Sequence, residues 1–150
     1  MPVVRWLGPL LLLAHATAAA PQVSASPDYI VLLSVPFVSG SDQLGPLARA
    51  RIDLAIPRLR EDYGESPIEL AGHSDGYGSA ASNQELSSRR AHAVFEYLQA
   101  NQVEMKFVFE RAYGASEPIA DNETRPGRFR NRRVELRQPR GPGPGDLSLP

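Results

Sequence analysis

The segment from Ile68 to Asn101 constrains the fold more than any other part of the chain, because a short apolar run precedes a long amphipathic pattern. Ile68–Gly72 is apolar and ends at a glycine-rich stretch, which is typical of a strand that leads into a loop. Ser82 is followed three residues later by Glu85, the capping-box pattern of a helix start. Apolar residues then recur at helical spacing as far as Asn101. The segment therefore predicts a strand, a loop and a helix in that order.

The rest of the chain adds a strand and a helix before this segment and two strands after it. Further strands are expected over Tyr29–Phe37, Lys106–Gly114 and Arg132–Gln138, and in the last of these the apolar Val134 and Leu136 alternate with polar residues. A helix is expected from Leu47, with a kink or an early end at Pro57 because proline removes a backbone donor. Residues 115–131 are polar and predict a loop. The order β-α-β-α-β-β predicts a two-layer α+β domain, with helices on one face of a four-stranded mixed sheet.

Both ends of the chain differ in composition from this domain, which is expected over residues 29–138. Residues 1–20 combine a basic start, an apolar core and small residues, which predicts a signal peptide cleaved after Ala18. The alternatives are a retained membrane anchor and a buried N-terminal helix, although the apolar run is shorter than the ~20 residues that span a bilayer. Residues 21–28 form a Pro/Ser linker. Residues 139–150 are rich in Pro and Gly and predict a disordered tail.

Composition excludes several classes of function. The chain has no cysteine, so disulfides, thiolate metal sites, a cysteine nucleophile and lipid attachment through cysteine are excluded. Its 16 basic and 17 acidic residues leave a net charge of −1, which argues against a nucleic-acid partner. Arginines are nevertheless concentrated between Arg125 and Arg140, where Glu135 is the one acidic residue. Such a run is either solvated surface or a region that faces anions.

The stretch Gly72–Gly76 spells G-x-S-x-G, the nucleophile pattern of the α/β-hydrolases. That pattern requires a helix directly after the second glycine, and the predicted helix starts several residues later. It also requires a downstream histidine, and His92 lies in the middle of the predicted helix. His73 would point away from Ser74, since neighbouring side chains of an extended chain alternate. No enzyme is therefore predicted, and no metal site either, because His73 and Asp75 lack a third ligand.

Asp75 remains as a charged residue in a glycine-bounded loop, with Arg89 and Arg90 in the following helix. A carboxylate and a guanidinium that face one pocket hold a zwitterion, by contacting its ammonium and its carboxylate. The alternative is an Asp–Arg salt bridge that braces the loop against the helix. Spacing alone favours the salt bridge over the zwitterion site.

Two long segments together resemble the OmpA-like peptidoglycan-binding domain, which also occurs in the peptidoglycan-associated lipoprotein and in flagellar stator proteins. The first is "IELAGHSDGYGSAASNQELSSRRAHAVFEYL", which matches a strand, Gly-His-Ser-Asp, a glycine and Asn-x-x-Leu-Ser-x-x-Arg-Ala-x-x-Val-x-x-Tyr-Leu. The second is "AYGASEPIADNETRPGRFRNRRVEL", which matches the pattern that closes on Asn-Arg-Arg-Val-Glu. The resemblance covers about residues 29–137.

The resemblance implies non-covalent binding of the peptidoglycan stem peptide in the periplasm, without catalysis, metal or cofactor. In the family, the Asp at the position of Asp75 contacts the ammonium group of diaminopimelate, and the Arg at the position of Arg90 contacts its carboxylate. Arg90 rather than Arg89 is the match, because it directly precedes the Ala of the motif. Ser74 is expected to hydrogen-bond the loop. The other matched positions expected near the ligand are Gly76, Asn83, Asn131 and Arg132.

The chain departs from the family pattern at three points. Ser39 and Gly40 stand where an aromatic residue and an acid are common, in a loop expected to border the ligand. Pro57 interrupts a helix that is usually continuous. The absence of a cysteine for lipid attachment predicts a stand-alone periplasmic form, held through a partner or its N-terminal segment. The alternative function is therefore a protein–protein interaction module of an envelope, secretion or stator complex, with weak or lost peptidoglycan binding.

Overall fold

A computed structural model of the chain describes residues 29–140. The expected signal peptide, the linker and residues 141–150 of the expected tail lie outside the described residues. Seven elements follow one another: β1 (Tyr29–Pro36), α1 (Pro46–Asp62), β2 (Pro67–His73), α2 (Ala80–Ala100), β3 (Phe107–Gly114), α3 (Arg125–Asn131) and β4 (Arg133–Pro139). β4 extends one residue beyond the expected end of the domain.

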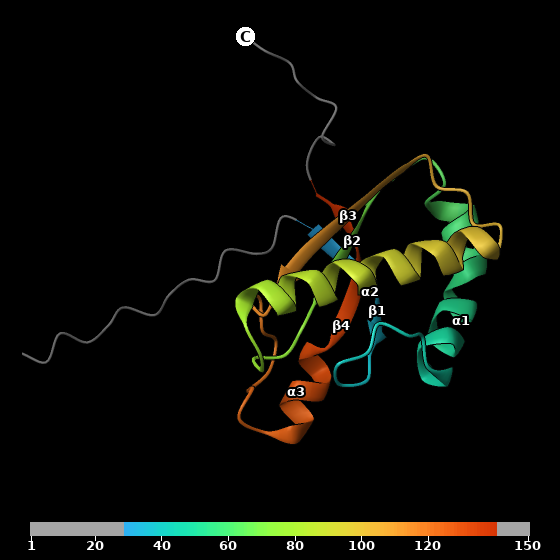
Figure 1. The fold of residues 1–150 in the computed structure, drawn as a ribbon. Helices are drawn as coiled ribbons and strands as arrows, with labels where there is room; N and C mark the ends of the chain where they lie inside the picture. Colours follow the sequence, from blue (N-terminus) through green and yellow to red (C-terminus); the bar gives the residue numbers. More distant parts are fainter. Residues whose placement is uncertain (1–28, 141–150) are drawn as a thin grey trace, which may run out of the picture.

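The strands form one mixed sheet in the order β1-β4-β2-β3. β2 and β3 are parallel, whereas β4 lies between β1 and β2 and is antiparallel to both. Helix α2 crosses one face of this sheet, and α3 lies at the end of the sheet where β4 begins (Figure 1). The expected two-layer α+β architecture with a four-stranded mixed sheet is confirmed.

The core lies between the sheet and helices α1 and α2. Even-numbered residues of two central strands face the helices, and all four are completely buried: Ile68, Leu70, Val134 and Leu136. The helices contribute apolar residues at helical spacing, among them Ile52, Ile56, Leu59, Ala91, Val94 and Leu98. This arrangement confirms the predicted alternation in β4 and the predicted apolar stripe of α2.

Three expectations about local structure are wrong. Of the kink or early end expected at Pro57, the early end is wrong: helix α1 continues to Asp62, and buried Ile56 and Leu59 flank the proline, so their burial outweighs a lost hydrogen bond. Helix α2 begins one turn before Ser82: the hydroxyl of Ser79 accepts a hydrogen bond from the Ser82 amide at 3.1 Å, and Ser79 is the N-cap. The predicted loop over residues 115–131 contains the short helix α3, which Thr124 caps.

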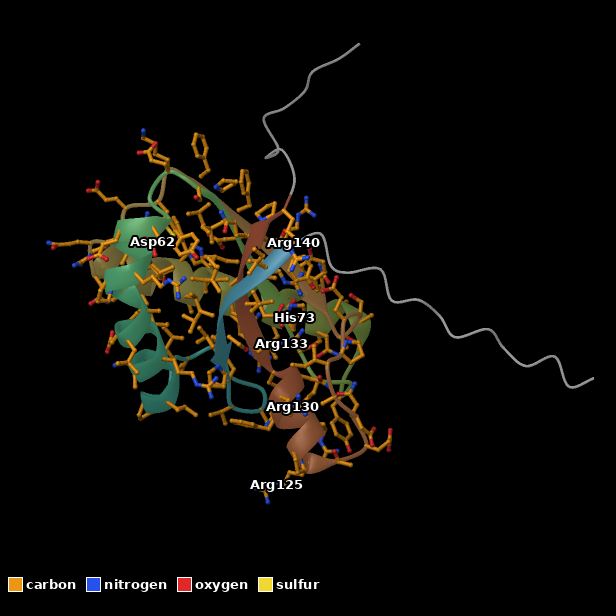
Figure 2. The ribbon with its side chains drawn as sticks, turned by 180° about the vertical axis from the view of Figure 1, so that it is seen from behind. Asp62, His73, Arg125, Arg130, Arg133 and Arg140 are labelled. Atoms are coloured by element: carbon orange, nitrogen blue, oxygen red, sulfur yellow. The ribbon has the colours of Figure 1, made fainter. Side chains whose placement is uncertain are left out.

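The face of the sheet opposite the helices carries a buried charged network. Odd-numbered residues of β4 point to this side, where the Glu135 carboxylate accepts hydrogen bonds from Arg133 and Arg137 at 2.5 and 2.7 Å. Figure 2 shows this side of the molecule, with His73 and Arg133 labelled at the sheet and Arg125 and Arg130 on α3. The arginine-rich run is thus divided, because part of it is buried in the sheet and part is exposed on α3.

Candidate functional site

The candidate site forms where three strand ends meet. In the sheet register Gly72 lies opposite Val134, and Pro36 lies opposite Arg133, so the end of β2, the end of β1 and the start of β4 are at the same edge. Antiparallel pairing brings residues that follow one strand next to residues that precede its neighbour. The topology therefore places the loop after β2 beside Arg132, which directly precedes β4.

Asp75 forms an ion pair with Arg132. Its Oδ2 accepts a hydrogen bond from Arg132 Nη1 at 2.9 Å, and its Oδ1 accepts one from the backbone amide of Tyr77 at 3.3 Å. The two side chains are only 9% and 13% exposed. Arg132 Nε also donates to the backbone oxygen of Phe37 at 3.2 Å. Each oxygen of the Asp75 carboxylate thus accepts one hydrogen bond, and both have acceptor positions left.

Arg90 is completely buried in α2 and binds backbone rather than carboxylate groups. Its guanidinium donates to the carbonyl oxygens of His73, Val38 and Ser41 at 2.9 to 3.0 Å. Burial lowers the pKa of Arg90 to about 10, while the charge of nearby Asp75 acts in the opposite direction, so the side chain stays protonated at neutral pH. A guanidinium has five N–H donors, and these three bonds to carbonyl oxygens use most of them within the fold.

Asp75 forms a salt bridge, as expected in the alternative role, but its partner is not an arginine of the following helix. Asp75 is braced by Arg132, not by an arginine of α2. Arg89 lies on the surface of α2 and pairs with Asp42 and Glu85. The sequence singled out Arg132 as a site residue through its resemblance to the family, but it did not predict this pairing.

The loop between β1 and α1 is held over the site by the two arginines. Arg132 and Arg90 bind the carbonyl oxygens of Phe37, Val38 and Ser41. Gly40 sits in a tight turn with a φ of +66°, closed by a hydrogen bond from the Ser41 amide to the Val38 oxygen. Glycine adopts this conformation without steric cost. Gly40, at a position where the family often has an acid, thus determines the shape of the turn beside the site.

Asn131 supports the site indirectly. Its side-chain oxygen accepts hydrogen bonds from the amides of Ile119 and Ala120, and its amide group donates to Ala120 and to Asn122 Oδ1. The same Asn122 oxygen accepts a hydrogen bond from the Gly76 amide at 3.0 Å. Asn131 therefore holds the loop that in turn holds Gly76. The side chain of Asn83, buried in the first turn of α2, lies beside Gly78.

His73 and Ser74 are not arranged as a catalytic pair. His73 Nε2 accepts a hydrogen bond from Arg137 at 3.1 Å on the charged face of the sheet, which puts the ring proton on Nδ1. Burial, together with the charges of Arg133 and Arg137, lowers the pKa of His73 to about 3, so it is a weak base. Ser74 was expected to hydrogen-bond the loop, but its hydroxyl is buried without a hydrogen-bond partner. Residues 29–140 contain no group of three side chains arranged to hold a metal ion.

Comparison with known protein families identifies the family to which this chain belongs. The model of the OmpA family matches residues 36–132. The chain belongs to the OmpA family. This is a family of peptidoglycan-binding domains and not of enzymes.

Individual relatives agree with this assignment. The chain is 37% identical over 103 residues to the outer-membrane lipoprotein YfiB of Pseudomonas aeruginosa, which covers 68% of this chain and 60% of the relative. It is 38% identical over 72 residues to the peptidoglycan-binding protein ArfA of Mycobacterium bovis, which covers 48% of this chain and 22% of the relative. The chain thus spans less than two thirds of either relative.

A solved structure shares the fold of this OmpA-family chain. The peptidoglycan-associated lipoprotein from Burkholderia pseudomallei superposes with a TM-score of 0.64 at 24% identity, covering 71% of this chain and 89% of that one. Among residues 29–140, no helix combines the length and the apolarity that crossing a bilayer requires.

Proposed function

We propose that this domain binds the peptidoglycan stem peptide non-covalently, through diaminopimelate, and so tethers or stabilises the cell envelope. The observation that carries the proposal is the cluster of Asp75, Arg132 and Arg90 at one end of the sheet. The far end of diaminopimelate is a zwitterion. Its ammonium group suits the Asp75 carboxylate, and its carboxylate suits the guanidinium of Arg90.

The hydrogen bonds already present leave capacity for such a ligand. Each carboxylate oxygen of Asp75 accepts one hydrogen bond, whereas an ionised carboxylate has about four acceptor positions. The Ser74 hydroxyl, one residue before Asp75, is buried without a partner.

Three further matched residues support the cluster in this proposal. Gly76 and Asn131 order the loop on one side of Asp75, and Asn83 is buried in the first turn of α2 on the other. None of these roles needs a cofactor. A weak contact is sufficient for a tether, because stem peptides are dense in the cell wall.

The proposed location is the periplasm, in association with the outer membrane or the cell wall. The relative YfiB is an outer-membrane lipoprotein and ArfA is a peptidoglycan-binding protein. The family match and the net charge of −1 both agree with an exported domain that meets peptidoglycan in the periplasm.

Sedimentation with insoluble peptidoglycan tests the proposal. The wild-type chain should sediment with the polymer, and Asp75→Asn should stay in the supernatant, because the ammonium contact loses its charge. Glu104→Gln is the matched control, since it removes one carboxylate charge from the exposed end of the loop before β3. Equal sedimentation of the wild type and Asp75→Asn would exclude the Asp75 cluster as the binding site.

A protein partner in the envelope is the second candidate. The observation that favours it is an apolar cavity of about 740 Å³ between β1 and α1, beside Leu54, which is 85% exposed. Exposed apolar surface of this kind marks interaction sites. A folded wild-type chain that does not sediment with peptidoglycan would favour this candidate over the first.

A further inference from the structure

Tyr77 is an exposed aromatic residue that is held in a fixed position. It lies two residues after Asp75 and is 67% exposed, and it takes no part in the core between the sheet and the helices. Its backbone amide donates to Asp75 Oδ1 at 3.3 Å, which ties its main chain to the candidate site. The guanidinium carbon of Arg128 lies 5.0 Å from the centre of its ring.

Arg128 is itself anchored, so the contact with Tyr77 is more than a chance surface pair. Its Nη1 donates to the backbone oxygens of Asn122 and Glu123 at 2.8 and 2.9 Å. A guanidinium within about 6 Å of a ring centre is attracted to the ring face. Arg128 therefore covers one face of the Tyr77 ring, and the high exposure of Tyr77 leaves the rest of the ring open to solvent.

A single exposed apolar side chain needs no functional explanation, because protein surfaces contain many. Tyr77 differs from such a residue in two ways. Its ring lies against Arg128, which is itself hydrogen-bonded to the backbone, and its backbone amide contacts Asp75. A fixed ring loses little conformational entropy when a ligand packs on it. It presents a flat apolar surface with a polar hydroxyl, and this combination suits a ligand that has both C–H and hydroxyl groups.

The chemistry of the proposed ligand supplies such groups near this ring. The stem peptide is joined to an N-acetylated sugar of the glycan strand, two residues before diaminopimelate. Measured from the ammonium group at Asp75, the diaminopimelate side chain, those two residues and the lactyl ether span at most on the order of 20 Å when extended. The chain from Asp75 to Tyr77 spans at most about 7 Å, and the tyrosine side chain extends that reach. A peptide held at Asp75 therefore brings its sugar to Tyr77 when it bends over the loop that carries both residues.

We propose that Tyr77 is a sugar-contacting residue, whose ring, fixed by Arg128, packs against the sugar that carries the stem peptide held at Asp75. This inference rests on the proposed function, because the peptide has to occupy the Asp75 cluster. The sugar contact adds to the affinity and distinguishes polymer-linked peptide from free peptide. The peptide contact at Asp75 does not depend on the tyrosine ring, since the Tyr77 hydrogen bond uses the backbone amide.

Calorimetric titration with two ligands tests this inference. One ligand is the diaminopimelate tripeptide alone, and the other is the same tripeptide on its disaccharide. The wild-type chain should bind the disaccharide form about two- to ten-fold more tightly, as expected for one additional packing contact on an aromatic ring. Tyr77→Ala should bind both ligands with the affinity that the wild type shows for the free peptide. Tyr77→Phe should retain the preference.

Phe107→Ala is the control, because Phe107 is also exposed but lies at the start of β3, at the opposite end of the sheet from Asp75. This variant should keep the wild-type preference for the disaccharide form. Equal affinity of the wild type for the two ligands, or a preference that survives in Tyr77→Ala, would overturn the inference and leave the proposed function intact. Failure of the wild type to bind either ligand would overturn the proposed function and this inference with it.

Discussion

Asp75 and Arg132 are 57 residues apart in the chain, yet their side chains form an ion pair of 2.9 Å. The pair joins the loop after β2 to the residue before β4, and Arg132 extends the connection to the end of β1 through the Phe37 oxygen. One arginine thus holds three strand ends together. The same pair places a carboxylate with spare acceptor capacity where the proposed ligand binds.

Arg132→Gln should destabilise the domain by about 1–3 kcal/mol, because it leaves the poorly solvated Asp75 carboxylate without its charged partner. Urea denaturation measures this change in the free energy of unfolding. Arg130→Gln is the matched control on the exposed surface of α3 and should change it by no more than about 0.5 kcal/mol. Identical denaturation midpoints for the two variants would show that the ion pair contributes nothing to the fold.

Arg90→Lys should be strongly destabilising although it conserves the charge. A lysine has one point-like ammonium group and does not reproduce the guanidinium fork that binds the carbonyls of His73, Val38 and Ser41. The expected cost is about 2–4 kcal/mol for a completely buried group that loses several charged hydrogen bonds.

The neighbouring Arg89→Lys is the control for this substitution. Arg89 is half-exposed and makes surface ion pairs, so the change should cost less than about 1 kcal/mol. Thermal and urea denaturation of the two variants give the comparison. A cost for Arg90→Lys as small as that for Arg89→Lys would mean that the three carbonyl contacts do not stabilise the loop over the site.

His73 should make the domain less stable as the pH falls. Burial and the charges of Arg133 and Arg137 lower its pKa in the folded state to about 3, from an ordinary value of 6.5. Between these values the unfolded chain binds a proton that the folded chain does not, so the free energy of unfolding falls as the pH is lowered through this window. The expected slope is about 1 kcal/mol per pH unit.

Urea denaturation at pH 7 and pH 5 checks this prediction. Glu135 contributes mainly at lower pH: burial raises the pKa of this carboxyl, but the hydrogen bonds from Arg133 and Arg137 outweigh burial and hold it below its ordinary value. His73→Gln keeps an acceptor for Arg137 and should reduce the loss of stability between the two pH values. A pH dependence that is unchanged in His73→Gln would contradict the assignment.

Sequence predicted those parts of the fold whose cause is local. The apolar spacing of α2 and the alternation of Val134 and Leu136 follow from helical and strand periodicity, and the structure has both. Helix α3 was missed because it spans only seven residues and has no apolar stripe. Its detectable features are Thr124 as the N-cap and Pro126 in the first turn.

The candidate site was predictable as a set of positions but not as a set of contacts. Asp75, Arg90 and Arg132 were singled out by their resemblance to a motif, and the role of each as a ligand contact stays a prediction. The pairing of Asp75 with Arg132 depends on the register of β2 against β4, which no local pattern encodes. The bonds of Arg90 depend on the path of the loop over residues 37–45, where Gly40 determines the turn.

The most direct test of the account is the affinity of the wild-type chain for two tripeptides that differ in the third residue. One contains diaminopimelate and the other contains lysine, which has the same ammonium group but lacks the carboxylate beside it. If a guanidinium binds this carboxylate, the diaminopimelate peptide should bind at least about ten-fold more tightly, as expected for one charge-assisted contact. In Asp75→Asn, the binding of both peptides should be lost. Equal affinity of the wild type for the two peptides, or unchanged binding by Asp75→Asn, would contradict the account.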